Sequence, residues 1–157
     1  MGSRVGVISD THGLLRPEAV CALSGVDYIV HAGDVGSANV LEALSQLAPV
    51  TAVRGNSDKG FWAEALPATE LLEVESCFLY ILHELEHLDL DPVAAGFHAI
   101  ITGHSHEPSA EFRNGVLYLN PGSAGPRRFE LPIALALLSI SARMPTVSVS
   151  LVESRST

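Results

Sequence analysis

The chain has 157 residues, of which 47% are hydrophobic and 17% charged, and its formal net charge is −9. This composition argues against disorder and predicts one compact domain over residues 1–157. The negative charge disfavours nucleic acid or an anionic membrane as a main partner, although a bound metal ion could still attract a small anionic substrate. Because no apolar run could span a bilayer and no signal peptide precedes the first strand, we expect a soluble cytoplasmic protein.

The first half of the sequence alternates short apolar strands with helices. Ser37 is placed to cap the start of the second helix, and proline lies in the first turn of the first one. Such strand–helix–strand alternation predicts a parallel sheet and therefore an α/β fold. The predicted elements are strand 4–9, helix 17–23, strand 27–31, helix 37–47 and strand 49–53.

The second half is richer in strands. Its last two strands are predicted to form an antiparallel pair, followed by a frayed tail at residues 155–157. The predicted elements are strands 70–75 and 77–82, a helix or loop at 91–96, and strands 99–102, 116–119, 131–140 and 146–152.

Five predicted strands run into short polar loops, most of them marked by glycine. In open α/β sheets, ligands bind outside the carboxyl ends of the strands, so these five loops are expected to meet at one edge. The loops are 9–13 (SDTHG), 32–34 (AGD), 54–58 (RGNSD), 82–83 (LH) and 103–106 (GHSH).

Two of these loops carry metal-ligand types at a spacing of two residues. Asp10 and His12 form one pair, and His104 and His106 form the other. Residues i and i+2 of an extended chain place their side chains on the same face, so each pair is expected to hold a metal ion.

The remaining loops complete a site for two ions. Asp34 has two carboxylate oxygens and can bridge two ions, Asn56 offers a carbonyl oxygen, and His83 offers another imidazole. Imidazole mixed with carboxylate suits manganese, iron, zinc or nickel better than calcium. Two such ions about 3.5–4 Å apart lower the pKa of a bridging water and clamp phosphoryl oxygens during in-line attack.

The segments D-T-H, G-D, G-N, H and G-H-S-H occur in the order seen in calcineurin-like metallophosphoesterases. With R-G-N-S-D and N-P-G-S, the sequence from about Val5 to Ser123 most resembles the small YfcE-type phosphodiesterases. The resemblance implies a four-layer α/β/β/α sandwich and a metal-dependent phosphoesterase that binds two divalent ions, with manganese the expected metal. A metal-activated hydroxide would attack the phosphorus of a small phosphodiester, or less readily a monoester; homo-oligomerisation is left open.

The resemblance also assigns roles to individual residues. One metal would be held by Asp10, His12, Asp34 and His106, and the other by Asp34, Asn56, His83 and His104. Asp34, Asn56 and His104 are the expected catalytic residues, and Arg54 and Asn56 the expected substrate-binding residues.

Two positions depart from the family pattern. Ser57 stands where many members have a histidine that stabilises the transition state or protonates the leaving group, although YfcE-type members commonly lack it too. Glu84 follows His83 where the family usually has glycine, and the loop that begins there is shorter than the usual loop of the family.

Other charged and histidine residues have simpler interpretations. A lone histidine is more often structural than a ligand, which applies to His31, His87 and His98. Arg54 could steer the substrate phosphate or only pair with an acidic neighbour. Residues 84–91 are expected to form a solvated acidic loop, since they lack the spacing of a calcium-binding loop.

Two other classes of function remain open. The first is a protein-binding scaffold like the retromer subunit that has the same fold with a degraded metal site. The second is a metal sensor without turnover. All seven ligand positions are filled by competent donors here, which favours the enzyme.

Overall fold

The computed structural model describes residues 2–141 and 144–151. α2 is the longest helix in these ranges, with eight residues, and none of the helices there is long and apolar enough to cross a membrane. The elements are β1 (Ser3–Ile8), α1 (Pro17–Ala22), β2 (Tyr28–His31), α2 (Ala38–Ser45), β3 (Val50–Ala52), α3 (Phe61–Glu64), β4 (Thr69–Val74), β5 (Cys77–Leu82), η1 (Leu85–His87), α4 (Pro92–Ala95), β6 (Ala99–Ile101), β7 (Ser109–Arg113), β8 (Val116–Asn120), β9 (Ala134–Ser141) and β10 (Met144–Leu151).

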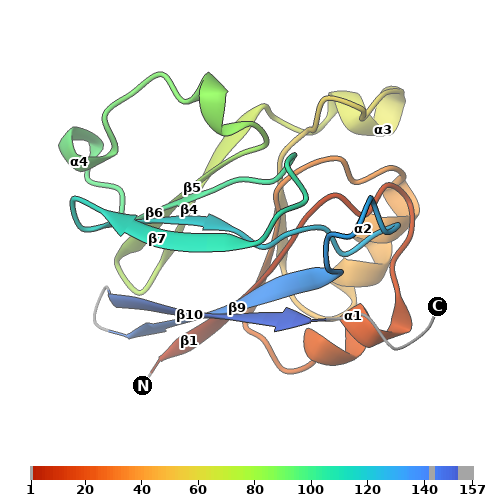
Figure 1. Cartoon of the computed structure of the whole chain (residues 1–157), viewed down its shortest axis with the longest axis horizontal. Coiled ribbons are helices and arrows are strands. Elements are labelled where there is room, and N and C mark those ends of the chain that lie inside the picture. Colours follow the sequence, from red (N-terminus) through yellow and green to blue (C-terminus); the bar gives the residue numbers. More distant parts are fainter. Residues whose placement is uncertain (1, 142–143, 152–157) are drawn as a thin grey trace.

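The strands form two five-stranded mixed sheets, which lie face to face (Figure 1). The first has the order β10-β9-β1-β2-β3, and the second β4-β5-β6-β8-β7. β1, β2 and β3 are parallel to one another, as are β5, β6 and β8. Buried side chains such as Val5, Val7, Leu79, Ile101 and Leu117 fill the space between the sheets. The predicted α/β fold with two central sheets is confirmed.

The outer layers differ in thickness. Leu44 of α2 and Leu23, which directly follows α1, pack with Ile8 and Ile29 on the outer face of the first sheet. Because β1 is therefore buried on both faces, its sequence is almost continuously apolar. The outer face of the second sheet is covered mainly by the segment that contains η1 and α4, where Phe97 stacks on Tyr80 and their ring centroids are 4.8 Å apart.

Some elements differ from the predictions. α3 and β7 are absent from the predicted set of elements. α3 is a single turn and is too short to show a helical period. Every residue of edge strand β7 is exposed, so this strand lacks the alternating hydrophobic pattern of a half-buried strand. Ser37 occupies the N-cap position of α2, but its side chain makes no capping hydrogen bond. The antiparallel pairing of β9 with β10 is confirmed, whereas Val152 and the predicted tail at 155–157 lie outside the described residues.

Candidate metal centre

The five polar loops meet at one end of the sandwich, beyond the carboxyl ends of β1, β2, β3, β5 and β6 (Figure 1). Backbone hydrogen bonds join them. The N–H of Asp10 donates to the carbonyl oxygen of Gly33 over 3.0 Å, which ties the loop after β1 to the loop after β2. The N–H of Gly103 donates to the carbonyl oxygen of His83, also over 3.0 Å, within the second sheet. The site is therefore built on strand ends whose positions the two sheets fix.

Asp10, His12 and His106 form the first group of potential ligands, with their ligand atoms within 4.8 Å of one another. Oδ1 of Asp10 lies 3.4 Å from Nε2 of His106 and 3.8 Å from Nε2 of His12. Three buried polar atoms in this group have no hydrogen-bond partner among the described residues: Asp10 Oδ1, His12 Nε2 and His106 Nδ1. A buried polar atom without a partner costs about 1–3 kcal/mol in stability. A metal ion bound by Asp10 Oδ1 and His12 Nε2 would satisfy these two atoms. The donors present therefore fit a divalent ion.

Asp34, His83 and His104 form the second group, again with ligand atoms within 4.8 Å of one another. Oδ1 of Asn56 joins them, 2.9 Å from Nε2 of His83 and 3.1 Å from Nδ1 of His104. The Asp34 carboxylate lies next to both groups, because its Oδ2 is 3.3 Å from Nε2 of His83 and 3.7 Å from Nε2 of His12. The structure thus brings all seven expected ligands together, with Asp34 between the two groups.

The i, i+2 spacing does not decide which ligands share a group. Asp10 and His12 belong to the same group, but His104 and His106 are divided between the two, so the spacing argument that His104 and His106 hold one ion together is wrong. The division that the family resemblance implies, with His106 beside Asp10 and His12 and with His104 beside His83, is the one that the geometry shows. All four have left-handed backbone, with φ of 55°, 48°, 74° and 65° in chain order. The premise of an extended chain does not hold in these loops, so the i, i+2 rule for strands cannot place their side chains.

The two aspartates are held in their ionised form. Burial alone would raise the pKa of Asp34, but hydrogen bonds from His83 and from the Ser57 backbone outweigh it and keep this pKa well below its ordinary value. Burial likewise opposes ionisation of Asp10, and contacts with His106 and Ser9 lower its pKa on balance. Both side chains are therefore carboxylates at neutral pH, as metal binding requires.

The pKa of His83 is shifted in the opposite direction. Burial would lower it, but the carboxylates of Asp34 and Asp10 raise it above its ordinary value. Nδ1 of His83 lies 2.8 Å from the carbonyl oxygen of Ala32, and this contact orients Nε2 towards the second group. A metal ion would compete with the proton on Nε2, so metal binding at this group should release protons.

Asp58 is an unforeseen supporting residue of the site. Its buried carboxylate accepts three backbone hydrogen bonds, from Val35 over 3.1 Å, Gly36 over 2.9 Å and Gly55 over 2.9 Å. It therefore joins the loop that carries Asp34 to the loop that carries Asn56. The sequence gives no signal for this role, because a buried carboxylate in the R-G-N-S-D segment cannot be told from an exposed carboxylate in an ordinary surface turn.

His31 supports the loops after β1 and β2 without touching either ligand group. Its Nδ1 accepts the N–H of Gly33 over 3.2 Å, and its Nε2 lies 2.9 Å from the hydroxyl oxygen of Thr11. That hydroxyl donates in turn to the carbonyl oxygen of Val35, so Nε2 of His31 must donate and the ring is neutral. Burial lowers the pKa of His31 to about 4, which agrees with this neutral form.

The other two lone histidines also lie outside the two ligand groups. His98 is structural, since its Nδ1 accepts the N–H of Phe78 over 2.9 Å. His87 is exposed and belongs to a separate cluster with Glu84 and Glu86 on the surface.

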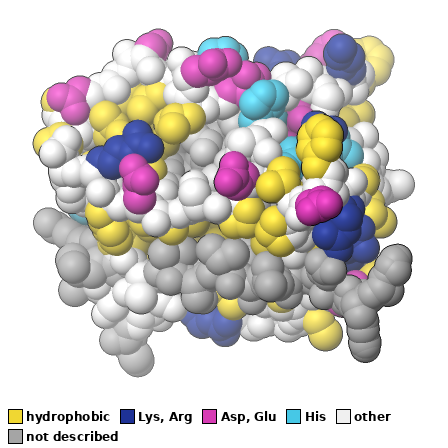
Figure 2. Space-filling view, viewed as in Figure 1, with side chains coloured by type: hydrophobic (Ala, Val, Ile, Leu, Met, Phe, Trp, Pro, Cys, Tyr) yellow, Lys and Arg dark blue, Asp and Glu magenta, His cyan; other side chains and the backbone are white. Residues whose placement is uncertain are grey.

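The 84–91 loop is less uniformly solvated than expected. Glu86 and Asp89 are exposed, but the Glu84 side chain is only 16% exposed, with Oε1 3.8 Å from Nε2 of His104. Figure 2 shows histidine and acidic side chains gathered at the upper right of this face. The expectation of a solvated loop is therefore wrong for Glu84, whose side chain turns towards a ligand.

Arg54 and Ser57 lie on the exposed side of the site. Arg54 lines a cavity of about 540 Å³ together with Asn56 and His83, and its guanidinium forms no ion pair within residues 2–141 and 144–151. Between the two interpretations of Arg54, this placement favours a role towards substrate. Ser57 is exposed, and its backbone N–H donates to Oδ1 of Asp34 over 2.9 Å.

Comparison with known proteins identifies the family. Residues 4–143 match the model of the calcineurin-like phosphoesterase superfamily domain. A probable metallophosphoesterase of Methanothermobacter thermautotrophicus is 36% identical over 148 residues, which cover 85% of this chain and 84% of the relative.

Two solved structures show how widely the fold is used. YfcE, a phosphoesterase from E. coli, aligns with a TM-score of 0.68 at 24% identity and covers 96% of this chain and 100% of its own. Vacuolar Protein Sorting 29 from Cryptosporidium parvum aligns with a TM-score of 0.76 at 20% identity, covering 95% of this chain and 97% of its own. These two likenesses concern the fold, whereas the family match and the curated relative carry the assignment: the chain belongs to the calcineurin-like phosphoesterase superfamily, whose members are metal-dependent phosphoesterases.

Proposed function

We propose that this protein hydrolyses phosphodiesters with two divalent metal ions, of which manganese is the best fit. The observation that carries the proposal is the arrangement of Asp34, whose carboxylate lies 3.3 Å from His83 Nε2 in one ligand group and 3.7 Å from His12 Nε2 in the other. A carboxylate so placed can serve both ions at once. The mixture of imidazole, carboxylate and amide oxygen suits manganese and its neighbours in the first transition series.

The residues around this centre have different roles, some as metal ligands and others as supports of the loops. Asp10, His12 and His106 would hold one ion, and Asn56, His83 and His104 the other, with Asp34 shared. When bound, two such ions lower the pKa of a water molecule and neutralise charge on the phosphoryl oxygens. Asp58 and His31 fix the loops in advance, so the ligands need little rearrangement during the reaction.

Arg54 and Ser57 bear on the substrate. The guanidinium of Arg54 lines the same cavity as Asn56 and can form charge-assisted hydrogen bonds to a phosphoryl oxygen. Ser57 cannot donate a proton as a histidine would, because its hydroxyl has no suitable pKa. Substrates whose leaving group departs without a proton are therefore expected to react fastest.

A protein-binding scaffold on the same fold is the competing proposal. A scaffold places no demand on metal ligands, so replacements would be expected among them. All seven donors are present in this chain and converge on two groups, which favours catalysis.

The proposal is tested by an activity screen of metal-stripped protein. Manganese, iron, zinc, nickel and magnesium would each be added against nitrophenyl monoesters, nitrophenyl diesters and cyclic nucleotides. We expect turnover only with metal, with manganese best and with diesters preferred over monoesters. Full metal loading without hydrolysis of any substrate would instead support the scaffold or a metal sensor.

A further inference from the structure

Two cavities flank the candidate metal centre on the side of the second ligand group. One, of about 400 Å³, is lined by His104, and the other, of about 540 Å³, is lined by Asn56 and His83. These three side chains meet at Oδ1 of Asn56, so both cavities begin at the same ligands. Glu84 lines both cavities and so stands on the wall between them.

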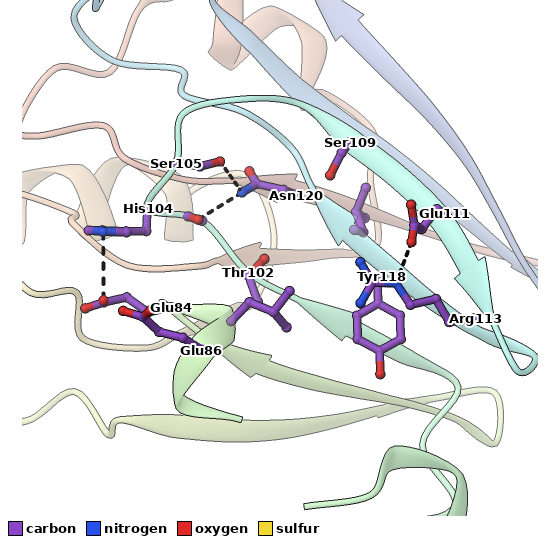
Figure 3. Close-up of a pocket in the computed structure, with 13 residues that line it drawn as sticks. Glu84, Glu86, Thr102, His104, Ser105, Ser109, Glu111, Arg113, Tyr118 and Asn120 are labelled. Atoms are coloured by element: carbon purple, nitrogen blue, oxygen red, sulfur yellow. Dashed lines mark hydrogen bonds and ion pairs between the residues drawn. The ribbon is translucent and has the colours of Figure 1, made fainter. Parts of the chain in front are cut away.

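The Glu84 carboxylate faces the entrance of the smaller cavity. Figure 3 shows His104 directly opposite Glu84, with Oε1 of Glu84 3.8 Å from Nε2 of His104. Nδ1 of His104 is turned the other way, towards Asn56, and is therefore the ring nitrogen nearer the metal centre. A phosphate bound at the centre would have the Glu84 carboxylate near it, separated from it by little more than the His104 ring.

The smaller cavity has an acidic lining. Glu84 and Glu86 form one side, and Glu111 and Arg113 the other (Figure 3). Arg113 is already engaged, because it pairs with Glu111 and stacks over Tyr118, 4.4 Å from the ring centroid. In the described part of the chain no lysine or arginine pairs with Glu84 or Glu86, so the side nearest the metal centre keeps negative charge.

We propose that each cavity receives one ester group of a phosphodiester, and that Glu84 selects against a second negative charge on the substrate. The preferred substrates are then diesters whose ester groups are uncharged or cationic, whereas phosphomonoesters and diesters with further phosphates are disfavoured. This inference rests on the proposed phosphodiester hydrolysis and adds the charge class of the substrate and the residue that sets it.

The physical basis is a difference of one unit charge. A phosphomonoester has a second pKa of about 6 and is mostly a dianion at pH 8, whereas a diester remains a monoanion. A carboxylate several ångströms away in a partly shielded site repels the additional charge, an effect of roughly tenfold in relative kcat/KM. Because Glu84 lines both cavities, this effect does not depend on which cavity takes the leaving group.

The test uses manganese-loaded protein and three substrates that share the p-nitrophenolate leaving group. These are p-nitrophenyl phosphate, methyl p-nitrophenyl phosphate and p-nitrophenyl phosphorylcholine, with net charges of about −2, −1 and 0 at pH 8. For each substrate the kcat/KM of Glu84→Gln is divided by that of the wild type, which cancels intrinsic reactivity. We expect this ratio to rise roughly tenfold from the cationic ester to the dianion.

Glu42→Gln is the matched control, since it removes the same charge on α2, away from the two cavities. Its ratio should be flat across the three substrates. A flat ratio for Glu84→Gln as well would overturn the inference while leaving phosphodiester hydrolysis intact. Failure of the wild type to hydrolyse any of the three would overturn the proposed function, and this inference with it.

Binding provides a readout that does not depend on turnover. Calorimetry would measure the dissociation constants of inorganic phosphate and of dimethyl phosphate for the manganese-loaded wild type and Glu84→Gln. The substitution should tighten phosphate binding roughly tenfold more than dimethyl phosphate binding. An equal effect on both anions would show that Glu84 does not sense substrate charge.

Discussion

The backbone N–H of Ser57 donates a hydrogen bond of 2.9 Å to Oδ1 of Asp34. This bond fixes the orientation of the carboxylate and leaves Oδ2 facing His12 and His83. An asparagine at position 34 would have to present its oxygen to the same N–H. Its NH₂ group, which cannot ligate a metal, would then point towards both ligand groups.

Asp34→Asn is therefore expected to impair both metal sites at once. Loss of a residue that only orients a ligand typically costs 10–100-fold in affinity or activity, so loss of this shared ligand should cost more than about 100-fold. The measurement is metal content and diester turnover, compared with His12→Ala as a single terminal ligand and with exposed Glu42→Gln on α2 as a charge control. If Asp34→Asn were less impaired than His12→Ala, Asp34 would not be the shared ligand.

Replacing Asp58 should damage the site without removing any ligand. The Asp58 carboxylate accepts three backbone N–H groups, and an asparagine would turn its own NH₂ towards at least one of them. An unsatisfied buried donor costs about 1–3 kcal/mol, so Asp58→Asn should lower the free energy of unfolding by that amount. Denaturant titration measures this change, with exposed Asp89→Asn as the control. Asp91→Asn would be unsuitable as a control, because the Asp91 side chain caps α4. Unchanged stability and metal content in Asp58→Asn would show that the three hydrogen bonds are dispensable.

His31 should make the stability of the metal-free protein depend on pH. Its pKa falls from 6.5 in the unfolded chain to about 4 in the folded protein because of burial. Between these values the unfolded state binds more protons, so folding stability decreases as the pH falls from 6.5 to 4. The full shift corresponds to about 3 kcal/mol. Denaturant titrations from pH 7 to pH 4 should show a steeper loss of stability in the wild type than in His31→Gln, and equal slopes would contradict it.

Much of the site follows from the order of its motifs along the chain. Asp10, Asp34 and Asn56 follow consecutive parallel strands, and the carboxyl ends of such strands share one edge, so their convergence could be inferred from the sequence. The spacing of His104 and His106 could not divide them between the two groups, although the family resemblance implies that division. The i, i+2 rule assumes an extended chain, whereas both residues have left-handed backbone, for which a histidine-rich loop carries no local signal.

The environments of Asp58 and Glu84 also cannot be predicted from the sequence. Each looks like a charged residue in a polar loop, and only the packing of separate loops shows that Asp58 is buried and that Glu84 turns towards His104. Edge strand β7 has no sequence signal for a related reason: all its side chains are exposed, so no alternating pattern marks it.

Ser57 leads to a prediction about leaving groups. A positioned histidine contributes about 10²–10⁴-fold through proton transfer, and serine cannot replace it. The wild type should therefore hydrolyse aryl diesters well and alkyl diesters poorly, with log kcat/KM falling steeply as the leaving-group pKa rises. Because Ser57 is exposed beside Asp34, Ser57→His should make that slope shallower. A shallow slope already in the wild type would mean that another group donates the proton.

The central claim is that two metal ions, held around Asp34, act together on a phosphodiester. It is tested most directly by adding manganese stepwise to metal-stripped protein while bound metal and the hydrolysis of methyl p-nitrophenyl phosphate are followed in the same samples. We expect turnover to appear with the second equivalent of manganese and to disappear on chelation. Full turnover with one ion per chain, or turnover that persists in chelator, would contradict it.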